Sequence, residues 1–232
     1  MERKEILWDN GPIFHYDTAL FPPGTDSFAL GYFARPRRGE KVCDLGSGCG
    51  LLGTLLLARE PSLTLYNVEI NPAAAAIAEQ NFTENGWAER VHHHIGDLRN
   101  PRTLPPAGSM DYCLSNPPYF KAGSGAACER EERQRERSEE QCTLNDVCAA
   151  AKYLLRWGGS FAMVHRPERL SDVLYAMREH GMEPKRLRFV LAGSEAAPSL
   201  FLVEGRRGGK SGLVVGPPLV IGSYEWEKVY FR

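Results

Sequence analysis

KVCDLGSGCG, residues 41–50, is the stretch from which the class of fold can be inferred. Its first half, Lys41–Leu45, has the apolar character of a short buried strand, and a leucine-rich, helix-forming run follows over residues 51–60. The glycines between them allow a tight turn and a close approach of the backbone to a ligand. The helix beyond begins with unpaired N–H groups. We therefore predict a strand, a ligand-binding turn and a helix in succession, with a purely structural turn as the alternative.

The rest of the chain alternates between strand-like and helix-like segments. Strands are predicted over residues 41–45, 63–70, 91–95, 110–115, 160–165, 185–191 and 200–204. Helices are predicted over residues 51–60, 73–85, 144–157 and 168–180, the second opened by Pro72 and the third ended by Gly158-Gly159. Such alternation is typical of a parallel sheet covered on both faces. Because no helix separates the last two strands, we predict an α/β, Rossmann-like fold with a mostly parallel, seven-stranded sheet and an antiparallel edge hairpin.

Two segments depart from this alternation. Residues 1–39 precede the first core strand and carry several aromatic residues, so we expect an N-terminal extension that packs on the ligand site of a single domain over residues 40–232. Residues 121–143 form a long insertion whose centre, residues 129–140, holds six Glu and four Arg. A solvated loop is the simplest interpretation of that insertion, and a functional lid is the alternative.

Composition narrows the class of protein further. The chain has 232 residues, of which 43% are hydrophobic and 25% charged, which excludes collagen-like, disordered and disulfide-scaffold proteins. The charged start leads into no apolar leader, and no apolar run is long enough to span a bilayer. Six cysteines in no CxxC pair indicate reduced thiols rather than a zinc site. We therefore expect a cytoplasmic protein with no metal and no membrane partner.

The glycine loop fits two ligands. Gly48, Gly50 and Gly53 satisfy G-x-G-x-x-G, and Glu69 lies 21 residues after Gly48, close to the spacing of about 20 in dinucleotide-binding sites. An NAD-dependent oxidoreductase is therefore one alternative.

The competing register is D-x-G-x-G-x-G over Asp44, Gly46, Gly48 and Gly50, which resembles motif I of class I S-adenosylmethionine methyltransferases. An acid beside a pyrophosphate is unfavourable, whereas S-adenosylmethionine carries an ammonium and a sulfonium that an acidic loop tolerates. Glu69, after the second strand, can accept the protons of both ribose hydroxyls, and Asp97, after the third, is placed to bind the adenine amine. We favour S-adenosylmethionine as the cofactor.

The fourth core strand ends in Asn116-Pro117-Pro118-Tyr119, an NPPY motif. It resembles motif IV of methyltransferases that act on adenine N6, guanine N2 or glutamine N5. A conjugated amine is a poor nucleophile, and the Asn116 side-chain carbonyl and Pro117 backbone carbonyl can accept its two protons and direct its lone pair. The prolines stiffen the loop, and Tyr119 offers a face for stacking. A structural proline turn is the alternative.

Phe120 extends this aromatic surface, which suits a nucleobase better than a glutamine side chain. A paired or stacked base would have to be extruded, at a cost of a few kcal/mol. A protein-glutamine N5 methyltransferase acting on release factors stays the second interpretation, and a non-catalytic RNA-binding module the third.

Together these motifs resemble a family, the bacterial tRNA(Val) adenine-N6 methyltransferases, over nearly the whole chain. The resemblance rests on residues 21–26 (FPPGTD), 44–50, 116–120, 165–170 (HRPERL), 183–186 (EPKR) and 202–205 (LVEG). It implies tRNA as partner, and a role for Thr25 and Asp26 in closing the cofactor pocket. Of the family's Ala-Arg-His-Glu after NPPY, Arg137 and Glu139 match and Glu136 and Ser138 do not, and Arg137 is carried over as a substrate contact. The sequence predicts no oligomeric state.

The near-neutral net charge of −1 argues against a strongly basic nucleic-acid binder. The charge is unevenly divided, however, because residues 1–149 hold 15 Lys+Arg against 21 Asp+Glu, whereas residues 150–232 hold 13 against 8. A basic C-terminal part suits a polyanionic substrate. Residues 206–210 (RRGGK) are interpreted as a hairpin turn or a phosphate contact, and residues 92–94 (HHH) as a strand rather than a metal site.

Overall fold

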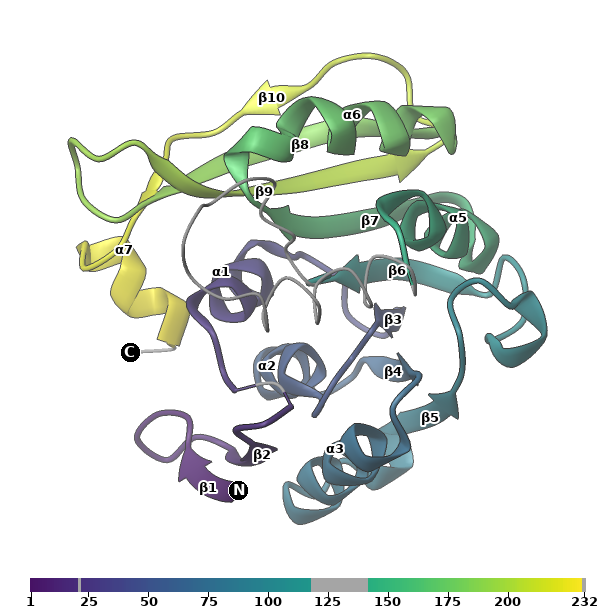
Figure 1. Ribbon diagram of the computed structural model, residues 1–232, viewed down its shortest axis with the longest axis vertical. Coiled ribbons are helices and arrows are strands. Elements are labelled where there is room, and N and C mark those ends of the chain that lie inside the picture. The colour runs from purple at the N-terminus through teal and green to yellow at the C-terminus, as the bar shows by residue number, and fades with distance from the viewer. Residues whose placement is uncertain (21, 118–141, 231–232) are drawn as a thin grey trace, which may run out of the picture.

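A computed structural model describes residues 1–20, 22–117 and 142–230. A large mixed sheet forms the middle layer of the molecule, with the strand order β10-β8-β9-β7-β6-β3-β4-β5 and with β11 also beside β8 (Figure 1). Its strands are β3 (Lys41–Leu45), β4 (Thr64–Glu69), β5 (Val91–Ile95), β6 (Met110–Ser115), β7 (Leu155–His165), β8 (Met182–Leu191), β9 (Pro198–Arg207), β10 (Val214–Val215) and β11 (Leu219–Val220). A separate hairpin pairs β1 (Glu2–Ile6) with β2 (Ile13–Asp17).

Helices cover both faces of the sheet. They are α1 (Thr25–Phe33), α2 (Leu51–Arg59), α3 (Pro72–Glu84), α5 (Leu144–Leu154), α6 (Leu170–Glu179) and the short α7 (Tyr224–Glu227). One apolar core holds α1, α2 and α3 against one face, and a second core holds α5 and α6 against the other. None of the helices in the described part of the chain is both long and apolar enough to cross a membrane.

The strand directions confirm the predicted class of fold. Strands β5, β4, β3, β6 and β7 pair in parallel, and β9 runs antiparallel to β7 and β8. The predicted count of seven strands is too low, because β10 and β11 pair with β8 and extend the sheet to nine strands, outside the predicted edge hairpin. Each has two residues, too few for an alternating apolar pattern to register.

The helix predicted over residues 144–157 is too long. It ends at Leu154, and Leu155 has an extended backbone with φ −67° and ψ 137°. Leu155 pairs with Met110, and Gly158, with φ 78°, lies in an irregularity before Ser160 pairs with Tyr112. The glycine pair therefore accommodates a bulge inside β7 and does not end a helix.

Residues 1–39 pack into the first core. Phe14 from β2 and Phe28 and Phe33 from α1 are buried in the same cluster as residues of α2 and α3. Arg59 of α2 donates to the carbonyl oxygens of Gly31 and Ala34 at 2.6 Å each, so α2 holds the end of α1. The domain boundary at residue 39 stays a prediction.

Candidate cofactor and catalytic site

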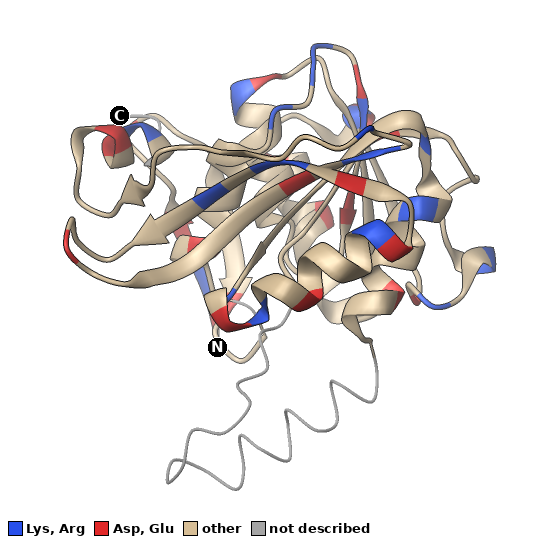
Figure 2. Ribbon diagram, turned by 90° about the horizontal axis from the view of Figure 1, so that it is seen from above, with Lys and Arg blue, Asp and Glu red and all other residues tan. Residues whose placement is uncertain are grey.

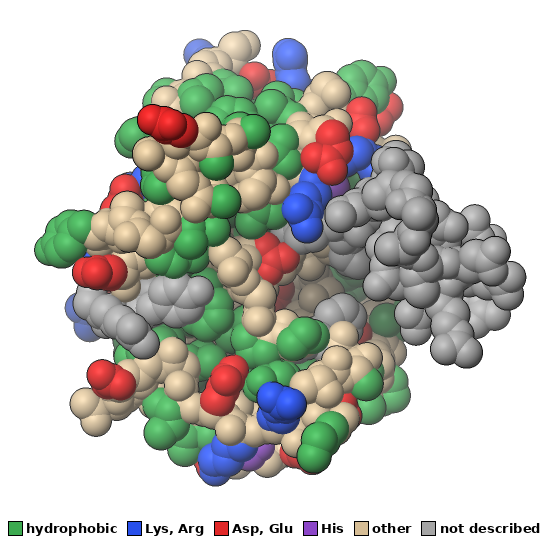
Figure 3. Space-filling model, turned by 60° about the vertical axis from the view of Figure 1, so that its left-hand side comes forward, with side chains coloured by type: hydrophobic (Ala, Val, Ile, Leu, Met, Phe, Trp, Pro, Cys, Tyr) green, Lys and Arg blue, Asp and Glu red, His purple; other side chains and the backbone are tan. Residues whose placement is uncertain are grey.

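A cavity of about 670 Å³ lies at the carboxyl ends of the parallel strands, where open α/β sheets bind their ligands. The space-filling view of Figure 3 shows a hollowed face of the molecule. Of the predicted site residues, the cavity is lined by Asp26, Gly46, Gly48, Glu69, Asp97, Asn116 and Pro117. The predicted Pro118, Tyr119, Phe120 and Arg137 lie outside the described residues.

The glycine loop adopts the backbone that its composition predicts. Gly46, Gly48 and Gly50 have φ angles of 74°, 53° and 83°, which side chains other than glycine rarely tolerate. The N–H groups of Gly46 and Ser47 both donate to the carbonyl of Val68, at 2.9 and 3.1 Å, and so fix the turn against the end of β4. A Cβ at Gly46 would meet no atom within 4 Å, which leaves the loop open toward the cavity.

Gly50 has a different role from the one predicted, because it does not line the cavity. A Cβ there would lie 2.9 Å from the Phe82 ring and 3.1 Å from the Cβ of Ala78, both on α3. A Cβ at Gly53 would lie 2.3 Å from Leu65. These two glycines let α2 pack closely on its neighbours, so of the G-x-G-x-x-G glycines only Gly48 faces the ligand space.

Glu69 is buried and holds the loop from below. One carboxylate oxygen accepts the N–H of Gly48 and the other accepts the N–H of Asn71, each at 2.8 Å. Each oxygen has a second lone pair, so the carboxylate can accept further hydrogen bonds from ligand hydroxyls in the cavity.

Asp44 lies fully buried in β3 beneath the glycine loop and does not line the cavity. Burial, and then the charge of Glu69, raise its pKa to about 8. Among the described residues neither of its carboxylate oxygens has a hydrogen-bond partner, and the same holds for the Asn67 amide on β4 and the Ser47 hydroxyl. Buried polar groups without a partner are rare in native proteins, and here several of them gather beneath the glycine loop.

Asp97 follows β5 and is ionised. Its carboxylate accepts hydrogen bonds from the Arg99 side chain at 2.6 and 3.0 Å and from the Arg99 backbone at 2.9 Å. The hydrogen bond from the Arg99 guanidinium holds the Asp97 pKa below its ordinary value. A ligand amine at this position would share the carboxylate with Arg99.

In the first turn of α1, Asp26 and Ser27 line the cavity and Thr25 does not. Asp26 lines the cavity, and its carboxylate accepts the N–H of Ser27 at 2.9 Å. Thr25 is exposed and is not among the lining residues, so the geometry gives it no contact with the cavity. Ser27, which the sequence analysis did not single out, lines the cavity and accepts a hydrogen bond from the Asn116 amide at 2.8 Å.

Two hydrogen bonds fix the end of β6 where the NPPY motif begins. The Ser115 hydroxyl donates to the Leu45 carbonyl of β3 at 2.8 Å, and Asn116 donates to Ser27 as described. Asn116 and Pro117 therefore stand at the cavity wall in a loop fixed by β3 and α1.

Sequence reasoning assigned no role to several residues that line the cavity, among them Phe14, Ile70, Leu98, His165 and Arg169. The His165 Nδ1 atom accepts the N–H of Arg166 at 2.8 Å. Burial, and then the charge of Arg169, lower its pKa to about 4, so His165 is neutral at pH 7. Their position in the sequence could have identified them, because each of these residues except Phe14 lies at or just after the carboxyl end of a core strand.

Two remaining segments lie apart from the cavity lining. His92 and His94 contact the Tyr66 ring at centroid distances of 4.6 and 6.1 Å, and His93 contacts Phe82 at 5.7 Å. Over the described residues there is no group of three metal-ligating side chains. Residues 206–210 comprise the last two residues of β9 and the turn after it, and because β9 is antiparallel to β7, they lie at the sheet edge opposite the cavity.

The strand order, the glycine loop and the acid at the end of β4 together define a Rossmann-like protein of the class I methyltransferase type. A family model described as the methyltransferase small domain matches residues 24–179, more than half of the sequence. The chain belongs to the methyltransferase small domain family.

Two curated relatives are tRNA1(Val) (adenine(37)-N6)-methyltransferases. The protein of Serratia proteamaculans is 33% identical over 150 residues, covering 64% of this chain and 56% of the relative. That of Yersinia pseudotuberculosis serotype O:3 is 32% identical over 170 residues, covering 71% and 66%. The match thus spans less than two thirds of the length of either relative.

Solved structures agree on the fold. A predicted O-methyltransferase from Agrobacterium tumefaciens superposes with a TM-score of 0.70 at 18% identity, covering 86% of this chain and 90% of that one. TrmN from Thermus thermophilus superposes with a TM-score of 0.58 at 19% identity, covering 78% and 48%.

Proposed function

We propose that this protein is an S-adenosylmethionine-dependent methyltransferase that acts on the N6 amine of an adenine in tRNA, the anticodon-adjacent adenine of tRNA(Val). The observation that carries the proposal is the position of Asn116 and Pro117, which line the same cavity as Gly46, Gly48 and Glu69. One cavity thus holds the acceptors for an amine and the loop for a cofactor. The substrate follows the names of the relatives, and we place the reaction in the cytoplasm.

The donor set of the cavity fits S-adenosylmethionine. Glu69, Asp97 and Asp26 line the cavity and make it acidic, which favours a ligand that bears an ammonium and a sulfonium and carries no phosphate. Glu69 would accept the ribose hydroxyls, Asp97 would accept the adenine amine, and Gly46 and Gly48 would let the ligand approach the backbone. The cofactor supplies an electrophilic methyl group.

The chain's own residues then orient the nucleophile. The Asn116 side-chain carbonyl and the Pro117 backbone carbonyl accept the two protons of the amine, which turns its lone pair toward the methyl group. Pro117 limits the backbone and keeps these acceptors in place before the substrate arrives. No strong base is needed, because the amine can lose its proton after the attack.

Residues 1–39 contribute to the site in this proposal as an extension that packs on it. Phe14, Pro22, Asp26 and Ser27 all line the cavity. Asp26 closes the cofactor side, and Thr25, which is exposed, contributes through its place in the first turn of α1 rather than by contact.

A polyanionic substrate fits the basic C-terminal part of the chain. Figure 2 shows Lys and Arg on this part of the sheet, where β8 carries Lys185, Arg186 and Arg188, whereas Arg206 and Arg207 of β9 lie at the edge opposite the cavity. The target base would be extruded from its stack to reach Asn116, and the predicted aromatic residues Tyr119 and Phe120 would stack on it.

Calorimetry and a transfer assay test the proposal in two steps. We expect the purified protein to bind S-adenosylmethionine and not NAD. We expect it to methylate a tRNA(Val) transcript with adenine 3′ of the anticodon, and not the same transcript with guanine there or a release factor. Binding of NAD alone, or methyl transfer to the release factor, would overturn it.

The variant Asn116→Ala separates catalysis from binding. It should abolish methyl transfer and leave the cofactor Kd within about twofold of the wild type. The matched control is Asn100→Ala, which changes an asparagine outside the cavity lining. An active Asn116→Ala enzyme would remove the proposed mechanism.

A further inference from the structure

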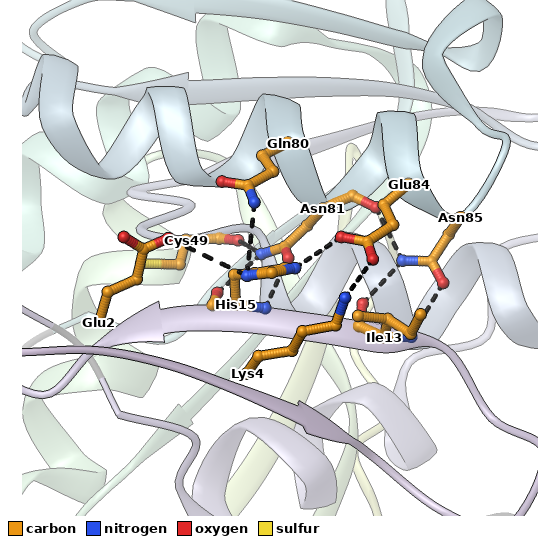
Figure 4. A network of polar contacts seen from close by, with 9 residues as sticks. All are labelled: Glu2, Lys4, Ile13, His15, Cys49, Gln80, Asn81, Glu84 and Asn85. Atoms are coloured by element: carbon orange, nitrogen blue, oxygen red, sulfur yellow. Dashed lines mark hydrogen bonds and ion pairs between the residues drawn. The ribbon is translucent and has the colours of Figure 1, made fainter.

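Two asparagines, Asn81 of α3 and Asn85 at the C-terminal cap of that helix, bind the edge of β2 that faces away from β1. Asn81, which is fully buried, accepts the His15 N–H at 2.6 Å and donates to the His15 carbonyl at 2.9 Å. Asn85 does the same for Ile13, at 2.9 and 2.7 Å (Figure 4). The other edge of β2 pairs with β1.

The spacing explains why two asparagines one turn apart suit this strand. Residues i and i+4 of a helix are separated by a rise of about 6 Å. Residues i and i+2 of a strand are about 6.6 Å apart and present their N–H and C=O groups on the same side. Each amide side chain offers one acceptor and two donor hydrogens, so the two asparagines replace a neighbouring strand for Ile13 and His15.

The two asparagines differ in their third hydrogen bond. The Asn81 amide nitrogen also donates to the carbonyl of Cys49, in the glycine loop, at 2.9 Å. The corresponding bond of Asn85, the C-cap residue of α3, goes back to the Asn81 carbonyl in the last turn of that helix at 2.7 Å. Asn81 therefore joins the hairpin β1–β2, helix α3 and the glycine loop, whereas Asn85 joins only the first two.

The residues that Asn81 connects also border the cavity. Phe14 lies between Ile13 and His15 in β2 and lines the cavity, as do Gly48 and Cys49 in the loop. The loop is thus held from two directions, since Glu69 accepts the Gly48 N–H while Asn81 donates to the Cys49 carbonyl. Two successive residues of the loop depend on these two side chains.

We propose that Asn81 is a positioning residue that holds the glycine loop against the N-terminal hairpin and thereby sets the affinity of the cavity for its cofactor. The inference rests on the proposed function, because the ligand of that cavity is taken to be S-adenosylmethionine. Asn81 does not line the cavity itself and acts through Cys49.

The remaining contacts of the hairpin with α3 do not reach the loop. The His15 Nε2 atom lies 2.6 Å from a Glu84 carboxylate oxygen, and Lys4 pairs with the other oxygen of the same carboxylate (Figure 4). The hairpin therefore keeps an attachment to α3 that is independent of Asn81, and loss of the Cys49 bond can be separated from loss of the hairpin.

The matched variants are Asn81→Asp and Asn85→Asp. Each keeps the acceptor for one N–H and places a carboxylate oxygen against two carbonyls, so both should lower the melting temperature. Titration with S-adenosylhomocysteine measures the Kd of each variant. Relative to the wild type, we expect a Kd about tenfold higher for N81D and less than twofold higher for N85D. An unchanged Kd for N81D, or an equal rise in both variants, would overturn the proposal.

Amide hydrogen exchange without ligand gives a second readout. N81D should speed the exchange of the amides of residues 46–50 relative to N85D, and equal rates would contradict the coupling. If N81D does not fold, Asn81→Ser and Asn85→Ser allow the same comparison without an added charge. A wild-type protein that binds no S-adenosylhomocysteine would refute the proposed function, while the exchange comparison still decides the role of Asn81.

Discussion

The amide nitrogen of Asn116 donates a hydrogen bond of 2.8 Å to the hydroxyl oxygen of Ser27, which joins the end of β6 to the first turn of α1. The two residues are 89 positions apart in the sequence, and both line the cavity. The N-terminal segment therefore contacts the side chain to which we assign the amine-binding role. An asparagine amide held at its nitrogen has a fixed orientation of its carbonyl.

Replacing Ser27 by alanine should lower kcat about fivefold to tenfold, because one hydrogen bond contributes about 1 kcal/mol and here orients the acceptor. The cofactor Kd should stay within twofold. Steady-state kinetics with a tRNA(Val) transcript measure the effect. Ser27→Thr, which retains the hydroxyl, should restore most of the rate, and the exposed Ser171→Ala is the control. A full rate in Ser27→Ala would show that this bond does not orient Asn116.

Replacing Asp44 by asparagine should stabilise the ligand-free protein increasingly as the pH rises. With a pKa of about 8 in the folded state against 3.8 in the unfolded chain, the folded protein binds one more proton between these values. The wild-type free energy of unfolding therefore falls through this window, by roughly 1 kcal/mol per pH unit from this group.

Urea denaturation of the wild type and Asp44→Asn at pH 5, 6, 7 and 8 measures the difference. The two free energies should diverge toward pH 8. Parallel curves across the four pH values would mean that Asp44 is ionised in the folded protein.

Two glycines of one loop should respond differently to alanine. Gly50→Ala should cost several kcal/mol, because its Cβ would meet Phe82 and Ala78 at 2.9 to 3.1 Å at a φ of 83°. Gly46→Ala meets no atom within 4 Å and should cost only the backbone strain, about 1 kcal/mol, while its Cβ enters the ligand space and weakens cofactor binding more than tenfold. Urea denaturation and calorimetry separate the two effects, and equal losses of stability would contradict the packing role of Gly50.

Replacing Arg59 by leucine should destabilise the protein by about 2 to 3 kcal/mol, because the half-buried guanidinium donates to three carbonyls near the end of α1, those of Gly31, Tyr32 and Ala34. The helix that carries Ser27 would lose its anchor, so kcat should fall as well. Thermal unfolding and kinetics check both effects. The exposed Arg38→Leu is the control and should stay within about 0.5 kcal/mol of the wild type, and an equally stable Arg59→Leu would rule out the anchor.

The fold followed from the sequence where a segment's own pattern specified it. The run from Lys41 to Gly50 combined a buried strand with glycines that require positive φ, and the structure has both. The pair Gly158-Gly159 misled, because glycine also accommodates a bulge, and only the pairing of Leu155 with Met110 distinguishes a strand from the end of a helix. Strands β10 and β11 depend on β8 for their hydrogen bonds and have no pattern of their own.

From the sequence alone one could predict the chemical types in the site, since Asp44, the glycines, Glu69 and the start of NPPY lie where parallel strands end. Tertiary structure alone decided which of them face the ligand. Gly50 turned out to be a packing residue, Thr25 is exposed, and Ser27, Asn81 and His165 are residues to which the sequence analysis had assigned no role, although His165 opens the HRPERL segment. The reason is physical, because a motif specifies local backbone and chemistry, whereas burial and hydrogen-bond partners depend on segments that meet only when the chain has folded.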